Sequence, residues 1–167
     1  GRRALIIDKP KTTQTQIYFG AIGLRPETPG FYEFQLANFA LGASSFQSRL
    51  MQELRVKRGW TYGASSLMRY GREPKHFVMY LFPKTDDTPP AIDLTLKIFD
   101  EFLVNGITKE EFEMARASLI KSAPFEYDTA QKRIENATNE YLIQFPERFQ
   151  KNFADNIEKV KFDNIAP

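Results

Sequence analysis

The stretch SSFQSRLMQELRVKRGWTYGASS, residues 44–66, changes from one periodicity to another over a few residues. Its first half places apolar residues at spacings of three and four, which predicts a helix. Its second half is rich in small and β-branched residues between turn signals, which predicts a strand. Cationic side chains gather at the end of the helix, where they favour the negative end of its dipole, and Gly59 follows as a residue suited to a positive φ.

Two polar side chains of this stretch are candidates for a functional site. Arg55 lies about one turn before the expected end of the helix, and Tyr62 opens the expected strand. A guanidinium is a permanently charged fork of N–H donors and a phenol offers one O–H donor, a combination that suits a peptide carbonyl or a developing oxyanion. Neither group is a nucleophile or a base near neutral pH, so the pair would assist chemistry performed elsewhere. The alternative is an ordinary helix-end arginine and an ordinary strand tyrosine.

The whole sequence predicts an α+β domain with a mostly antiparallel sheet backed by helices on one face, in the order β-β-α-β-β-α-α-α-α. Strands are expected at 4–8, 15–24, 61–70 and 76–82, with the last two forming a hairpin and 76–82 in the centre of the sheet. Helices are expected over 31–58, 88–105, 108–123, 129–145 and 146–160. Gly42 and the serines at 44 and 45 interrupt the first helix, as a bend or a close contact would require. The small residues of 61–70 predict that another backbone or a ligand approaches that strand closely.

Composition excludes several classes of site. The chain has 167 residues, which suits one domain over 1–167, and its net charge of +2 from mixed charges does not demand nucleic acid or an anionic membrane as partner. The absence of cysteine excludes disulfides, thiolate zinc sites and a cysteine nucleophile. No apolar run reaches the ~20 residues of a membrane span. With one histidine, His76, and no H-E-x-x-H or H-x-x-E-H, the chain does not hold a catalytic zinc by itself.

Three further features have plain structural interpretations. His76 is expected at the surface end of a strand, because no set of metal-binding partners lies near it in the sequence. The acidic run at 109–113 is expected at the start of a helix, where Thr108 and Glu111 match a capping box. The cations and the single aromatic residue of the basic run at 55–60 are too few for a nucleic-acid surface. The end of a helix explains this run better.

The same stretch closely resembles the signature of the second, non-zinc domain of the pitrilysin/insulinase family, the inverted zinc metallopeptidases related to the mitochondrial processing peptidase. The matching residues are S-R-L at 48–50, E-L-R at 53–55, Gly59 and Tyr62. Weaker likenesses flank them, namely KPKTTQTQIYFG with Gln14 and Gln16, and NGITKEEFEMARASL. The likeness covers roughly residues 5 to 160. Trp60 departs from the pattern, because smaller apolar residues are more usual there.

The resemblance implies a fold of two related α+β halves, of which the first binds zinc and the second contributes an arginine and a tyrosine across the cleft. Carried over by position, Arg55 would contact the substrate carbonyl and Tyr62 would donate to the oxyanion. The chain would then be the substrate-binding, non-zinc domain of a zinc metallopeptidase, inactive alone, with no cofactor of its own and the zinc in its partner domain. Its partners would be a zinc-bearing domain or subunit and a peptide. A structural or assembly subunit, or an unrelated α+β binding domain, are the alternatives.

The resemblance also predicts that the chain is a fragment of the C-terminal non-metal domain of a larger protein. Family domains carry a strand and a helix before the expected strand at 4–8, and a helix and a strand after residue 167. A sheet without those outer strands would expose unpaired edges, which predicts self-association. The sequence does not determine the compartment, and the bacterial periplasm or the cytoplasm is the preferred interpretation.

Overall fold

The computed structural model describes residues 11–44 and 46–165, so the strand expected at 4–8 lies outside the described residues. Its strands are β1 (Ile17–Ile22), β2 (Thr61–Met68) and β3 (His76–Pro83). They form one antiparallel sheet in the order β1-β3-β2. The hairpin of β2 and β3 and the central position of β3 confirm the sequence prediction.

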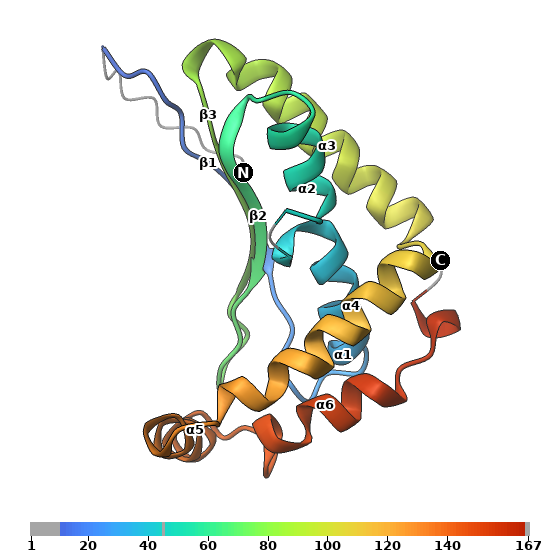
Figure 1. Ribbon diagram of the computed structural model, residues 1–167. Helices are drawn as coiled ribbons and strands as arrows, with labels where there is room; N and C mark the ends of the chain where they lie inside the picture. Colours follow the sequence, from blue (N-terminus) through green and yellow to red (C-terminus); the bar gives the residue numbers. More distant parts are fainter. Residues whose placement is uncertain (1–10, 45, 166–167) are drawn as a thin grey trace, which may run out of the picture.

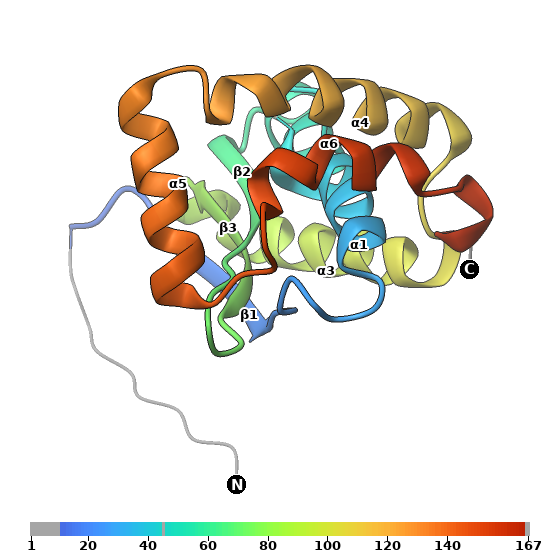
Figure 2. The same ribbon diagram turned by 90° about the horizontal axis from the view of Figure 1, so that it is seen from below.

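The helices cover one face of this sheet, and the described residues place none on the opposite face (Figure 1). The helices are α1 (Phe31–Asn38), α2 (Arg49–Met51), α3 (Thr88–Asn105), α4 (Lys109–Ser122), α5 (Ala130–Ile143) and α6 (Phe149–Lys159). Helices α4 and α6 lie side by side, and α5 stands at one end of the sheet (Figure 2). The α+β class with helices on one face is therefore confirmed. None of the described helices has the length and apolar character needed to cross a membrane.

Helix ends follow the local signals in the sequence. Thr108 and Glu111 form the expected capping box at the start of α4, with the Glu111 N–H donating to Thr108 Oγ1 at 3.2 Å and the Thr108 N–H donating to Glu111 Oε2 at 2.7 Å. Helix α3 has proline in its first turn and ends at Gly106, whose φ is 63°. Helix α4 ends just before Pro124, because proline removes a backbone donor.

The first helix expected from the sequence is divided into two. Helix α1 continues as a π-helical turn, η1 (Phe39–Ala43), and α2 continues as a second, η2 (Gln52–Val56). Between these two segments the chain is extended at Ser44 and again at Ser48. Gly42 explains why small residues stand at the break, since a Cβ there would lie 2.4 Å from the backbone nitrogen of Ser66 in β2. The break and the close contact that the sequence suggested are therefore both present.

The core fills the space between the sheet and the helices. Alternate residues of β3 supply the sheet side of this core, and the helices supply the rest. The large buried apolar residues are Phe77, Met79 and Leu81 from β3, with Phe31, Leu36, Leu41, Leu50, Leu54, Phe102, Phe112, Phe149 and Ile157 from the helical layer. Burial of such side chains contributes roughly 1.5–3 kcal/mol each, so this layer fixes the position of the helix end relative to β2.

Candidate functional site

The turn that joins η2 to β2 positions both predicted site residues. The Lys57 N–H donates to the Gln52 carbonyl oxygen at 2.9 Å, which widens the last helical turn by one residue where the sequence predicted a regular α-helix. The Gly59 N–H donates to the Arg55 carbonyl oxygen at 2.9 Å, and the φ of Gly59 is 64°. The expectation that glycine ends this helix with a positive φ is confirmed, and the chain turns directly into β2.

A β-bulge decides which way Tyr62 points. Thr61 pairs with Pro83 and Ala64 pairs with Leu81, so β2 contains one more residue than β3 over this interval. With strict alternation, Tyr62 would share the buried, helix-covered face with Ala64. The extra residue instead turns Tyr62 outward, and 80% of its surface is exposed. The bulge is held by the Thr61 hydroxyl, which donates to the Gly63 carbonyl oxygen at 2.8 Å and accepts from the Gly63 N–H at 3.2 Å.

Close approach to β2 occurs at one small residue and not at another. Gly42 packs against Ser66, as the run of small residues predicts, and the Ser66 hydroxyl also donates to Asn38 Oδ1 at 2.5 Å. At Gly63 no described residue comes close, because a Cβ there would meet nothing within 4 Å. Gly63 lies in the bulge, where the chain needs an extra residue.

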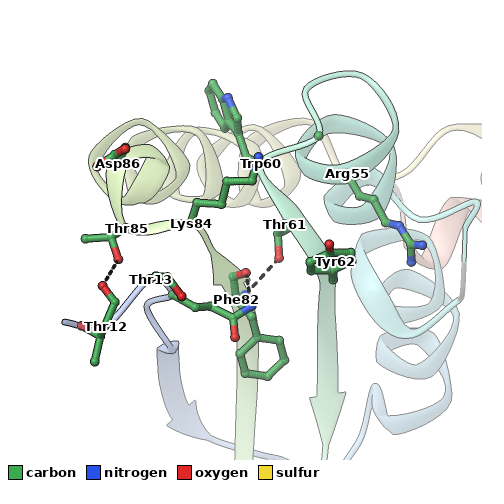
Figure 3. Close-up of a pocket in the computed structure, with 12 residues that line it drawn as sticks. Thr12, Thr13, Arg55, Trp60, Thr61, Tyr62, Phe82, Lys84, Thr85 and Asp86 are labelled. Carbon is green, nitrogen blue, oxygen red and sulfur yellow. Dashed lines mark hydrogen bonds between the residues drawn. The ribbon is translucent and has the colours of Figure 1, made fainter.

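Arg55 and Tyr62 line the same open cleft, whose volume is about 900 Å³. Its lining comes from the segment before β1, from the η2–β2 turn and from the end of β3 (Figure 3). The lining residues are Thr12, Thr13, Gln14, Arg55, Gly59, Trp60, Thr61, Tyr62, Phe82, Lys84, Thr85 and Asp86. Neither Arg55 nor Tyr62 is sealed in the apolar interior. Figure 3 shows the Arg55 guanidinium on the far side of Tyr62 from Lys84.

The Arg55 guanidinium keeps its hydrogen-bonding capacity for a ligand. Its Cζ lies 4.7 Å from the centroid of the Phe46 ring, and no described residue forms an ion pair or a hydrogen bond with its side chain. The neighbouring cations differ, because Lys57 and Arg58 both pair with Glu53, the latter at 2.6 Å. Hydrogen bonds from Lys57 and then Arg58 lower the pKa of the Glu53 carboxyl.

The opposite wall of the cleft is the chain segment that precedes β1. Gln14 Nε2 donates to the Phe82 carbonyl oxygen at 3.1 Å, and Gln14 bridges to Lys84 through the backbone. The Thr85 N–H donates to the Thr13 carbonyl oxygen at 3.1 Å. Sequence reasoning named Gln14 and Trp60 but not Thr61, Lys84 or Asp86. Counting the register of the hairpin from its turn would have placed Lys84 opposite Thr61, and the β-bulge moves it to Trp60.

A second arginine of the same motif has a different environment. Arg49 forms a two-pronged ion pair with Glu111, with Nε to Oε1 at 2.7 Å and Nη2 to Oε2 at 2.6 Å, and Nη2 also donates to the Gly106 carbonyl oxygen at 3.0 Å. Burial of the Glu111 carboxyl opposes its ionisation. The hydrogen bonds from Arg49 and from the Thr108 N–H outweigh that cost, and the net pKa of Glu111 is lowered. Arg49 thus joins α2 to the start of α4.

The remaining candidates have the structural roles expected of them. His76 is exposed at the first residue of β3, and the acidic run opens α4. Within residues 11–44 and 46–165, no group of three or more histidine, cysteine, aspartate or glutamate side chains could hold a metal ion.

A family model described as the peptidase M16 inactive domain matches residues 1–119. The chain belongs to this family of inactive domains. The resemblance to pitrilysin and insulinase relatives is thereby confirmed, and the zinc of such peptidases belongs to the partner domain.

Individual relatives of this M16 inactive domain are distant. The curated protein "Non-peptidase homolog YmxG" of Helicobacter pylori is 26% identical over 155 residues, which cover 92% of this chain and 36% of that protein. A peptidase M16 inactive domain from Pseudomonas fluorescens superposes with a TM-score of 0.80 at 24% identity, covering 91% of this chain and 36% of that one. Complex III of Candida albicans contains a chain that superposes with a TM-score of 0.76 at 12% identity, covering 93% of this chain and 39% of that one. The chain therefore spans about a third of each of these three proteins, and the two structural likenesses show the fold alone.

Proposed function

We propose that this M16 inactive domain is the substrate-binding half of a zinc metallopeptidase. The observation that carries the proposal is the open cleft lined by both Arg55 and Tyr62, in which no described residue neutralises the Arg55 guanidinium. A neutral, extended peptide fits such a cleft, because its carbonyl oxygens are acceptors that need donors and carry no charge of their own.

In this proposal each residue has a separate task. Arg55 directs two N–H groups at a substrate carbonyl oxygen and polarises it, while its stacking on Phe46 limits its rotation. Tyr62, turned outward by the bulge, donates its O–H to the negative oxygen that develops when the carbonyl is attacked. The partner domain supplies zinc, which activates the attacking water, and the inactive domain supplies binding and charge stabilisation.

The test uses the complete protein, with the zinc-bearing domain or subunit in place. Arg55→Ala and Tyr62→Phe should each lower peptide turnover about 100-fold, the usual effect of removing one donor to an oxyanion. Zinc content, measured by metal analysis, should stay unchanged because neither residue is a ligand. Tyr18→Phe is the matched control, since Tyr18 is an exposed tyrosine of the same sheet outside the cleft lining. Wild-type turnover in both cleft variants contradicts the proposed roles.

A second candidate function is a structural or assembly subunit that performs no proteolysis. Two comparisons favour it: the curated relative is named a non-peptidase homolog, and a chain of complex III shares the fold. An H-x-x-E-H domain elsewhere in the parent protein, or in its partner subunit, separates the two readings. If that motif is missing and the wild-type assembly cleaves no peptide, the structural role is the correct one.

A further inference from the structure

The cleft contains a second cation that carbonyl binding does not need. Lys84 lies directly after β3 and lines the cleft, and no described residue forms an ion pair with its amine. Asp86 is the one carboxylate in the lining, and it has no ion-pair partner among the described residues either. With Arg55 and Lys84 against Asp86, the cleft has an excess positive charge that a neutral peptide backbone would leave unmatched.

The backbone holds Lys84 beside Trp60. The Lys84 N–H donates to the Trp60 carbonyl oxygen at 3.2 Å, which extends the β2–β3 ladder by one pair. Figure 3 shows Lys84 rising towards Trp60, with Thr61 and Tyr62 between that end of the cleft and Arg55. The Arg58 guanidinium lies 5.4 Å from the Trp60 ring centroid, so a further cation faces the same indole.

The spacing of these groups matches that of an extended peptide. Trp60 precedes Tyr62 by two residues, which in extended backbone places them at most about 6–7 Å apart. In an extended peptide, side chains two residues apart lie on the same side of the chain, also about 6–7 Å apart. A peptide that runs alongside this segment, with one carbonyl at Arg55 and Tyr62, would bring the side chain two positions towards Trp60 near Lys84.

We propose that Lys84 is a specificity-determining residue that selects peptides with an aspartate or glutamate two residues from the bond held by Arg55 and Tyr62. This inference rests on the proposed function, because Tyr62 defines where the bond lies. The lysine amine is a compact charge on a flexible stem and pairs with the carboxylate of the peptide. The Trp60 ring packs against the methylene groups of that acidic peptide side chain.

The experiment measures peptide binding by the complete protein, so it does not depend on turnover. Pairs of labelled peptides that differ only by glutamate or glutamine, two positions on either side of the cleaved bond, are titrated by fluorescence anisotropy. The wild type should bind one glutamate peptide about threefold to fivefold tighter than its glutamine partner, the scale of a solvent-exposed ion pair. Lys84→Gln should remove the preference, and Lys84→Glu should reverse it in favour of a lysine peptide. The preference should also shrink in high salt.

Lys75→Gln is the matched control, because Lys75 is an exposed lysine immediately before β3 and Lys84 is the one immediately after it. A preference that Lys84→Gln leaves unchanged, or a wild type that binds both peptides equally, overturns the inference. If either of these results is found while Arg55→Ala still lowers turnover, only the role of Lys84 has failed and the proposed function stands. If Arg55 and Tyr62 variants keep full turnover while the glutamate preference depends on Lys84, the catalytic proposal has failed and the binding site stands.

Discussion

Two clefts each take part of their lining from the η2 segment, and their arginines have opposite surroundings. The smaller cleft, of about 450 Å³, is lined by Arg49, Glu53, Arg58 and Glu111, and every one of these charges has a partner within it. The larger cleft is lined by Arg55 and Lys84, which have no ion-pair partner among the described residues. A charged side chain whose hydrogen bonds are made within the protein stabilises the fold, whereas one with unused hydrogen-bond donors can bind a ligand.

The largest effect on the free energy of unfolding should appear when the paired arginine, Arg49, is removed. Arg49→Ala should lower the free energy of unfolding by about 2–3 kcal/mol, because it leaves the half-buried Glu111 carboxylate without its partner. Arg55→Ala, the matched control, should change that free energy by less than about 0.5 kcal/mol. Urea unfolding of the chain, followed by circular dichroism, measures both. Equal losses in the two variants would erase the distinction between the clefts.

A charge-preserving change at the unpaired arginine should affect turnover and not stability. Arg55→Lys keeps the positive charge and loses the planar fork, so turnover of the complete protein should fall about tenfold. Peptide hydrolysis at saturating substrate provides the measurement, with unfolding in urea as the check on the fold. Full activity in this variant would show that Arg55 acts through its charge alone.

The paired cleft should also make stability depend on pH. Because the folded pKa of Glu111 is lowered, its contribution is complete above the carboxyl's unfolded pKa of about 4.3 and is lost as the pH falls through the folded value. Glu111→Gln should therefore be less stable than the wild type at pH 7, and this difference should shrink as the pH falls below about 4. Urea midpoints between pH 3 and pH 7 test this. A constant difference across that range would contradict the assigned cause.

The smallest effect is expected at Glu53, whose ion pairs with Lys57 and Arg58 face the solvent. Glu53→Gln should lower the free energy of unfolding by less than about 1 kcal/mol, since exposed pairs contribute little. The urea midpoint measures it, and 0.5 M salt should reduce the difference further. A loss as large as that of Arg49→Ala would mean that this exposed pair also holds the fold.

The predicted elements that the structure confirms depend on neighbours in the sequence. The capping box of Thr108 and Glu111 and the left-handed Gly59 involve groups a few residues apart, so the residue types suffice to place them. The apolar runs likewise identified the hairpin and its central strand. Sequence reasoning failed on the regular α-helix expected up to Arg58, because the π-helical turn depends on how η2 packs against β2.

The motif predicted that Arg55 and Tyr62 lie at one edge, where a helix end and a returning strand meet, and both residues line the same cleft. What it could not show was that Tyr62 faces the open side, because that requires the register between Thr61 and Leu81. Nor did it show that Arg49 is bound by Glu111, 62 positions away. The pairing with the zinc domain, the catalytic roles and self-association stay predictions.

The sequence by itself determined the class of fold, the ends of most helices and strands, and which residue types could serve a peptide, because short-range hydrogen bonds and hydrophobic periodicity decide these features. Tertiary structure alone decided which arginine is consumed by an ion pair, which way Tyr62 points and that Lys84 stands beside Trp60. These outcomes depend on contacts between distant parts of the chain, and a one-residue shift in strand register changes the face to which a side chain points.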